Sequence, residues 1–461
     1  MVAEKAGVPT VTDVCSAFVE QARAIGGMSG VPGGRVAAYP GHIDMHSVEQ
    51  RSTYFRETVL PQIIAALTGP VTEPAGESGA EPALRDIVFS GTFDEVNEFF
   101  HGRGWSDGLP VVPPTIQRVE QFLKYTDRPC DEVIGVLPPS NCAATVWSVA
   151  VNGVMAGCRP EYMPVLIALV EVMATPQFNL ATAGATPGWE ALIILNGPII
   201  KHLGFNCGVG ALRPGPLPNT SVGRFWRLYL RNVPVFIPGS TDKGTWGRNF
   251  DVVLAENHDA LDEIGWAPLS VQQGFAAGDN VVTVQSARGR GYDTAVRGST
   301  ARENLDRVSY ALLCFQQNRI NQITSKQSML LGLTPLNAGV IARDGFPRKE
   351  DVVQYLWERV RLPARVIEAI GDEGSPWEAR PGFGKDLRDA ARMGLLPELY
   401  CESNDPERML PVWRSPDELR IVVSGDPGRN RALIIGSNIE HGLATSKKIG
   451  LPANWEKLPK R

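Results

Sequence analysis

Apolar residues recur at helical spacing in several stretches of the chain and fill short continuous runs in others. In residues 12–28 (TDVCSAFVEQARAIGGM) they recur every three or four positions, after an Asp and before a Gly-Gly pair, which is typical of a helix. The run ALIIL at 191–195 ends in Asn-Gly-Pro and is typical of a buried strand. By the same criteria the sequence predicts helices over 12–28, 47–68, 93–101, 116–125, 144–156, 160–174, 221–231, 304–318 and 349–360. Strands are predicted over 35–39, 133–137, 191–195 and 281–285, and a last strand begins at 420–424.

Strands and helices mix along most of the chain, which predicts the α/β class: mixed sheets with flanking helices. At 461 residues the chain is too long for one ordinary core. A faint echo between 186–204 (TPGWEALIILNGPIIKHLG) and 426–444 (DPGRNRALIIGSNIEHGLA) suggests two related halves, with a chance match of apolar strands as the alternative. We expect an incomplete N-terminal element (1–68), a linker (69–85), a core α/β domain with the site loops (86–280), a second α/β half (281–440) and a C-terminal tail (441–461).

Charge and composition narrow the classes of partner. The net charge is −5 with a pI of about 5.8, and no long Lys/Arg run occurs, so neither nucleic acid nor an anionic membrane is an expected partner. The N-terminus lacks the pattern of a signal peptide, and charged residues interrupt the apolar stretch 143–175, which we interpret as buried helices. Seven cysteines without a C-x-x-C pair favour reduced thiols. A cytoplasmic location is expected.

The loop GRGWSDGLPVVPPT (102–115) is the first candidate site segment. Its prolines exclude a helix interior, and its glycines and prolines disfavour a central strand. Such a stiff loop would present Trp105, Ser106 and Asp107 as one wall of a pocket. The alternative is local: Asp107 accepts backbone N–H groups in an Asx-turn, and Trp105 fills the edge of the core.

The run GFNCGVGALRPG (204–215) is the second candidate. Gly208 and Gly210 would let the backbone approach a ligand, with Asn206 and Cys207 pointing toward it and the amides forming a nest for a carboxylate or phosphate. The run matches neither the dinucleotide fingerprint nor a Walker loop. A tight connection that needs positive φ angles is the alternative.

Charged and amide side chains follow in and after the helix predicted at 221–231. Arg224 and Arg227 share one face, where Arg224 could clamp a carboxylate; a salt bridge to Glu256 or Asp251 is the alternative. Glu256 and Asn257 could act as general base and amide donor, or simply end a surface helix.

Three thiols are candidates for nucleophilic chemistry, with buried and inert cysteines as the alternative. Cys158 precedes a predicted helix, Cys207 lies in the Gly-rich run, and Cys142 lies in a turn. The triplet His42-x-Asp44-x-His46 has no further His or Cys close in sequence, so no metal site is expected. The sequence does not identify a cofactor.

Several ordered motifs resemble the core of UGSC-type proteins, a family named for a selenocysteine- or cysteine-Gly-Ser-Cys motif in a Rossmann-like domain. They are GWSDGLPVVPPT, AGCRPEYMPV, FNLAT, NGP, the N-x-G-x-G run at 206–210, NTSVGRFWRL from Asn219, AEN at 255–257, LTPLNAGVIARDGFPRKEDVVQYLWE at 333–358 and IVVSGDPGR at 421–429. The resemblance implies thiol or selenol chemistry. This chain lacks the Cys-Gly-Ser-Cys motif, and residues 1–68 resemble only the end of the family's Rossmann-like domain. The reactive thiol has therefore moved, been lost, or is supplied by a partner.

We expect a small-molecule enzyme of oxidoreductase or lyase type, or its catalytic subunit, with a small anionic substrate bound between the loops at 104–110, 206–215 and 249–257. Thiol-assisted redox chemistry or cleavage of a carbon–heteroatom bond would use Cys207 or Cys158 as the nucleophile. Arg224 and the amides of 208–210 would hold the anion, and Asp107 or Glu256 would move the proton.

The alternative function is a non-catalytic or scaffold subunit of a heteromer that completes a partner's Rossmann-like domain. The strand at 35–39 has no obvious neighbour in the next 50 residues, and open strand edges recruit other chains. We therefore expect an obligate oligomer with residues 1–68 at the interface, and a heteromer rather than a homodimer.

Overall fold

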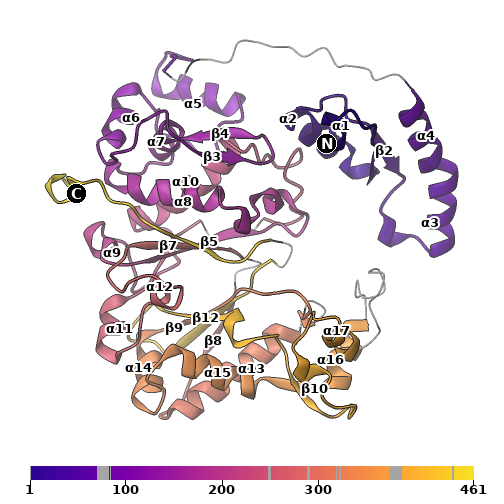
Figure 1. Cartoon of the computed structure of the whole chain (residues 1–461). Helices are drawn as coiled ribbons and strands as arrows, with labels where there is room; N and C mark the ends of the chain where they lie inside the picture. The colour runs from indigo at the N-terminus through magenta and orange to yellow at the C-terminus, as the bar shows by residue number, and fades with distance from the viewer. Residues whose placement is uncertain are drawn as a thin grey trace.

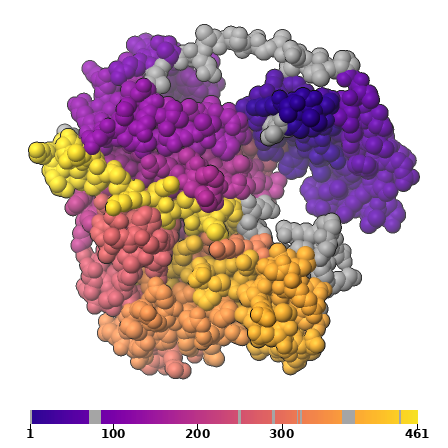
Figure 2. Space-filling model, viewed as in Figure 1, coloured from indigo at the N-terminus to yellow at the C-terminus, as the bar shows by residue number. Residues whose placement is uncertain are grey.

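The computed structural model describes residues 2–69, 83, 85–247, 251–287, 291–317, 319–320, 323–372, 387–438 and 441–460. Its secondary structure belongs to the α/β class, with several mixed sheets and flanking helices, as predicted. An N-terminal unit (residues 2–69) stands beside a larger main body (Figures 1 and 2).

The helices of the N-terminal unit are α1 (Val2–Lys5), α2 (Val19–Met28), α3 (Val48–Tyr54) and α4 (Leu60–Thr68), with a π-helical turn at Phe55–Val59. Those of the main body are α5 (Phe93–Gly102), α6 (Ile116–Leu123), α7 (Val146–Met155), α8 (Met163–Met173), α9 (Ile199–His202), α10 (Leu217–Asn232), α11 (His258–Ile264), α12 (Leu269–Gln272), α13 (Ala301–Gln317), α14 (Pro335–Arg343), α15 (Lys349–Arg359), α16 (Ala364–Asp372) and α17 (Leu387–Arg392). The strands are β1 (Thr12–Cys15), β2 (Val36–Tyr39), β3 (Val133–Leu137), β4 (Cys142–Thr145), β5 (Glu190–Asn196), β6 (Leu254–Ala255), β7 (Val281–Ala287), β8 (Tyr292–Ala295), β9 (Met329–Leu333), β10 (Arg361–Pro363), β11 (Met409–Pro411), β12 (Leu419–Val423), β13 (Arg431–Ile435) and β14 (Thr445–Lys448).

The main body has four layers, with two sheets stacked between two layers of helices (Figure 1). Alternate residues of β5 point to opposite faces, as in any strand. Ile193 and Leu195 join a core with residues of α7, α8 and α10, whereas Leu192 and Ile194 pack in the core between the sheets. Leu330 of β9 enters that same inner core, and its neighbours in β9 pack on the helices of the opposite side. Burial on both faces explains why these strands read as continuous apolar runs.

The two central sheets repeat one pattern of strand directions. The first has the order β6-β5-β7-β14, and the second has the order β12-β9-β13-β8. In each, the first pair is parallel and the other two pairs are antiparallel. The registers also correspond, because Leu195 lies opposite Ala255 in the first sheet as Leu333 lies opposite Val423 in the second. Two topologically related halves are therefore present.

Each half supplies the last strand of the other half's sheet. After β5, β6 and β7, the chain enters the second sheet as β8; after β9, β12 and β13, it returns to the first sheet as β14. In this exchange β5 and β9 occupy equivalent positions in the two sheets. The sequence echo, which aligned β5 with β13, therefore relates strands that are not equivalent. The domain boundary expected at residue 280 stays a prediction. β7, which follows this boundary, pairs with β5, which precedes it, and β14 lies in the segment that was expected to be a C-terminal tail. Most of the expected linker (69–85) lies outside the described residues.

The N-terminal unit is a β-α-β arrangement, which corrects the helix predicted over 12–28. Residues 12–15 instead form β1, which pairs in parallel with β2. The β-branched Thr12 and Val14 favour an extended strand, and the helix begins at Val19. A neighbour was expected to be missing from the 50 residues after the strand at 35–39, but β1 precedes this strand and pairs with it, so the inference that it is unpaired is wrong.

Further strands were missed where their apolar patterns are short. β4 begins at Cys142, which was expected to lie in a turn, and β13 and β14 follow the strand that was expected to be last. β9 was also missed, whereas β3 has the predicted bounds.

No single described helix is long and apolar enough to cross a membrane. One bent pair, 160–173 with 176–184, passes the test of length and composition together. The α8 part of this pair is almost wholly buried in the main body.

Removing residues 441–461 should destabilise the first sheet more than the second. The deletion removes β14 and the buried Trp455, which packs in the core of the first half. Hydrogen exchange followed by mass spectrometry should show lost protection in β5 and β7, with β9 and β12 as internal references. Unchanged protection of β7 would contradict the importance of the exchanged strand.

Candidate functional site

Helix α10 gathers segments from all three predicted site loops. Gly104 O accepts a hydrogen bond from Arg231, and Asn206 N–H donates to the side chain of Asn219. The third segment runs directly along the helix, since a Cβ placed on Gly223 would lie 2.2 Å from Asp251 O. Residues 249–250 of the third loop lie outside the described residues. That these segments bind a substrate stays a prediction.

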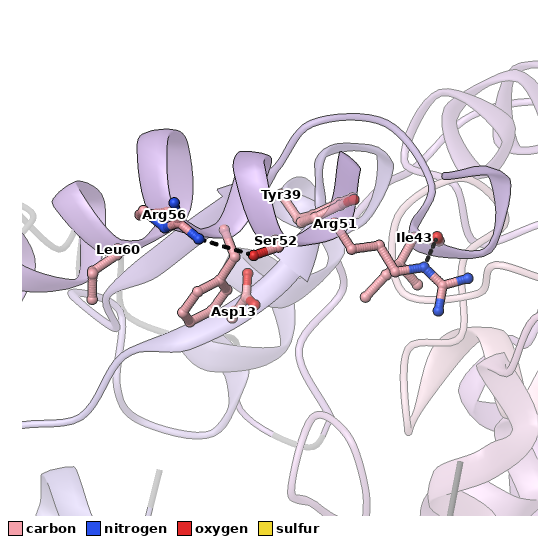
Figure 3. Close-up of a pocket in the computed structure, with 8 residues that line it drawn as sticks. Asp13, Tyr39, Ile43, Arg51, Ser52, Arg56 and Leu60 are labelled. Atoms are coloured by element: carbon pink, nitrogen blue, oxygen red, sulfur yellow. Dashed lines mark hydrogen bonds between the residues drawn. The ribbon is translucent and has the colours of Figure 1, made fainter. Parts of the chain in front are cut away.

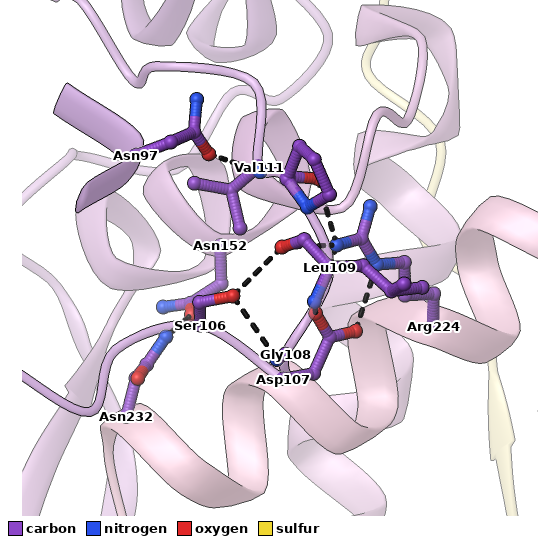
Figure 4. Close-up of polar contacts among 10 residues, drawn as sticks. Asn97, Ser106, Asp107, Gly108, Leu109, Val111, Asn152, Arg224 and Asn232 are labelled. Atoms are coloured by element: carbon purple, nitrogen blue, oxygen red, sulfur yellow. Dashed lines mark hydrogen bonds and ion pairs between the residues drawn. The ribbon is translucent and has the colours of Figure 1, made fainter. Parts of the chain in front are cut away.

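Asp107 and Arg224 form a two-point ion pair (Figure 4). Arg224 Nε lies 2.8 Å from Asp107 Oδ2, and Nη2 lies 2.8 Å from Oδ1. Burial alone would raise the pKa of Asp107, but hydrogen bonds and charge from Arg224 lower it below its usual value. Arg224 also donates to Pro110 O, so this guanidinium holds the protein's own loop rather than standing open for an anion.

Trp105 and Asp107 have the local roles of the alternative interpretation, since Asp107 accepts a hydrogen bond from Leu109 N–H, and Ser106 is also bound locally. Trp105 packs edge-on against Phe99 and Phe100 at the rim of the core. Ser106 Oγ donates to Leu109 O at 2.7 Å and accepts from Gly108 N–H. The polar groups of this loop therefore bind one another and α10.

The Gly-rich loop is held by two buried asparagine contacts. Asn219, which is fully buried, donates to the carbonyls of Asn206 and Val253. The side chain of Asn206 closes its own turn by accepting from Gly208 N–H. Gly210 has φ of 71°, so a positive φ is indeed required in this connection.

Neither leading thiol is activated in this structure. Cys158 is buried, and burial raises its pKa to about 12 despite a hydrogen bond to Ser221 and the charge of Arg224. Burial also raises the pKa of Cys207, whose carbonyl accepts from Ser424 Oγ and from Gly425 N–H. A nucleophilic role needs the thiolate, which these environments disfavour.

Glu256 lies where the two halves meet and forms a buried ion pair with Lys349. The side chains are 0% and 1% exposed, and the Nζ–Oε1 distance is 2.6 Å. Oε1 also accepts from Val423 N–H, and Oε2 accepts from the Asn196 side chain and Leu269 N–H. With four donors and no exposure, the carboxylate has no lone pair facing solvent, and this placement does not favour its predicted role as a general base.

Asn257 caps α11, since its side chain accepts from Ala260 N–H, and its own N–H donates to Val423 O. Ser424 Oγ donates back to Ala255 O at 2.9 Å. The ends of β6 and β12 therefore bind each other directly, which makes this junction a structural one.

A second polar cluster surrounds Arg227. Its nearest carboxylates are Glu190, at 3.4 Å, and Asp242, at 3.8 Å. Burial raises the pKa of Glu190 to about 8, against the lowering effect of Arg227. The predicted partners of Arg224 and Arg227 were thus wrong in identity, although an ion pair was the correct type of contact.

The N-terminal unit presents an open strand edge. Among the described residues β1 pairs with β2 alone. The outer edge of β2 is closed by Gln62, whose side chain accepts from Ala38 N–H and donates to Ala38 O. Thr12 N–H donates to Arg35 O, so the alternation of an extended strand turns the N–H of Asp13 away from β2.

A cavity of about 480 Å³ lies beside this edge (Figure 3). Its lining residues are Asp13, Tyr39, Ile43, Arg51, Ser52, Phe55, Arg56 and Leu60. Within the described ranges no group of three or more His, Cys, Asp or Glu side chains could hold a metal ion.

Comparison with known proteins agrees with this α/β chain being a UGSC-type protein. Residues 1–69 match the model of the UGSC family. The matched segment coincides with the N-terminal unit, and it does not include 86–440, where the sequence motifs carry the resemblance. No curated protein and no solved structure matches the chain.

Some important groups gave no signal in the sequence. Lys349 lies in an ordinary charged helix start, and Gln62 lies in an apolar helix; neither has a distinctive spacing. For β1, the β-branched pair Thr12 and Val14 was an available signal, but the helical spacing around it was given more weight.

Replacing Lys349 by Met should lower the free energy of unfolding by about 3–5 kcal/mol, because it leaves a buried carboxylate without its counter-ion. The double variant Glu256→Gln with Lys349→Met should recover part of this loss. Lys201→Met, which breaks the exposed pair with Asp259, is the matched control and should change little. A denaturant titration that finds both single variants equally mild would contradict the account.

The rate at which each cysteine is alkylated should follow the solvent access of its thiol. At pH 7.5 a pKa of about 12 leaves on the order of one thiolate per 30,000 Cys158 side chains. We expect iodoacetamide to label the exposed Cys142 first, Cys207 more slowly, and Cys158 only after unfolding. Mass spectrometry of timed samples provides the measurement, and fast labelling of Cys207 or Cys158 in the folded chain would restore thiol catalysis as the leading function.

Proposed function

We propose that this chain is a non-catalytic subunit of a heteromeric complex, and that its N-terminal unit completes the parallel, Rossmann-like sheet of a partner polypeptide. The observation that carries the proposal is the pair of edges in the N-terminal unit. Gln62 closes the outer edge of β2, while β1 keeps the outward-facing groups of Asp13 unpaired with any described strand. An open edge of this kind is a template for another strand.

The arrangement of the helices in the N-terminal unit supports the addition of a partner's strand beside β1. In the parallel register, Asp13 and Cys15 share a face with Ala37 and Tyr39. That face is covered at β2 by α3, α4 and the π-helical turn between them, which carries the buried Val59, whereas α2 packs on the sheet from the other side. A two-stranded sheet needs further strands or packing for stability, and a partner's strand would provide both.

The unit contacts the main body through a hydrogen bond and a cation–π contact. Gln21 donates to Thr241 O at 3.2 Å, and Lys243 lies 5.7 Å from the ring of Phe18. These contacts involve α2 and the turn before it rather than the exposed Asp13. The main body, with its exchanged strands, would then serve as a scaffold attached to the partner through this unit.

Thiol-assisted catalysis within this chain has weaker support. Burial raises the pKa of both Cys158 and Cys207, and Asp107 and Glu256 are each engaged in an ion pair. The predicted thiol mechanism would need at least one of these groups to be free for substrate.

The proposal predicts that Asp13→Pro abolishes assembly and Asp13→Asn does not. Proline removes the outward N–H without removing a bond to β2, whereas asparagine removes the charge and keeps the N–H. The tagged full chain and both variants would be purified from native cells, and native mass spectrometry would give the masses and stoichiometry of any complex.

Support requires a stoichiometric second polypeptide that protects the amide of Asp13 from exchange, stays bound to the Asn variant and is lost from the Pro variant. A monomeric wild-type chain, or equal binding by all three proteins, would refute the proposal.

A further inference from the structure

The cavity beside β1 lies at the position that the next helix of a growing α/β sheet would occupy. α3 and α4 cover β2 on this face, and their cover ends over β1, where Asp13 forms part of the cavity wall. Strands added in parallel are connected through helices that pack on the sheet faces. Asp13 therefore belongs both to the open edge of β1 and to the wall of the cavity.

The cavity is bordered by apolar side chains that are unusually exposed. Phe55 is 45% exposed and Leu60 is 38% exposed, and the stripe continues along α4 with Ile64 and Leu67, which are 53% and 43% exposed. Leu60, Ile64 and Leu67 follow the i, i+4, i+7 spacing of one helix face. Ile63, which packs on the sheet, lies next to this stripe on the same side of α4, so the sheet covers only one edge of the helix's apolar face.

Two arginines stand at the ends of the cavity and have no carboxylate partner among the described residues. Figure 3 shows Arg56 and Arg51 on either side of Asp13 and Ser52. Arg56 donates to Ser52 Oγ at 3.2 Å, and Arg51 donates to the carbonyls of Ile43 and His46. An apolar floor between two such cations is complementary to an apolar surface with acidic edges.

We propose that this cavity docks an amphipathic helix of the partner, with an apolar face over Phe55 and Leu60 and with Asp or Glu side chains toward Arg51 and Arg56. This inference rests on the proposed function, because the helix belongs to the polypeptide whose strand pairs with β1. It adds the position of the partner's helix and the kinds of side chain on the helix face that contacts this chain.

Phe55→Asp should weaken binding of the partner identified by the Asp13 experiment by about tenfold or more, because it places a charge at the centre of the contact. Met393→Asp, on an exposed residue of the main body, is the matched control and should leave binding unchanged. Arg56→Glu should also weaken binding, and its effect should shrink in high salt. Arg23→Glu, on the helix that covers the other face, is the control for charge.

Circular dichroism and the denaturation midpoint of each variant would establish that it is folded. A photo-crosslinking residue at Ser52, tested in the wild-type background, provides an independent readout. We expect it to react with a helix of the partner that carries acidic residues beside an apolar face.

The outcomes separate the two proposals. If Asp13→Pro abolishes binding while Phe55→Asp and Arg56→Glu do not, the helix-docking inference is wrong and the strand-pairing function stands. A crosslink from Ser52 to a second copy of this chain, or to a strand or loop of the partner, also overturns the inference. If none of the three variants changes binding, both proposals fail.

Discussion

The buried ion pair between Glu256 and Lys349 joins the two halves of the main body, and the packing of one half on the other depends on it. Glu256 follows β6 of the first sheet, and Lys349 begins α15, which packs on the second sheet. A carboxylate and an ammonium taken out of water are tolerated when each is paired and hydrogen-bonded. Val423 N–H, Asn196 and Leu269 N–H complete the set of donors to the carboxylate. The exchanged strands β8 and β14 then link the halves a second time, so neither half has a complete sheet without the other.

Several of the predicted site residues of the main body are engaged in its own contacts. Asp107 holds Arg224, Asn219 holds the Gly-rich loop, and Cys158 is buried. The N-terminal unit combines an open strand edge, an exposed apolar stripe and two arginines without carboxylate partners among the described residues. The proposed partner surface therefore lies in residues 2–69.

The local parts of this structure were predictable from sequence, and the long-range parts were not. The α/β class, β3 and the helix after Thr92 follow from periodicity and capping, which depend on neighbouring residues. The Asx-turn at Asp107 was also readable. Its pairing with Arg224 joins residues 117 positions apart, and no spacing rule encodes that contact. No spacing rule encodes the pairing of Lys349 with Glu256 either. The exchange of β8 and β14 could not be predicted, because short strands in exchanged positions have no sequence period of their own.

A structure of the native complex is the most direct test of the claim that this chain completes a partner's sheet. The account predicts a strand from another polypeptide running beside β1, hydrogen-bonded to the outward groups of Asp13. A β1 edge that faces solvent in the complex, or that pairs with β1 of a second copy of this chain, would contradict it.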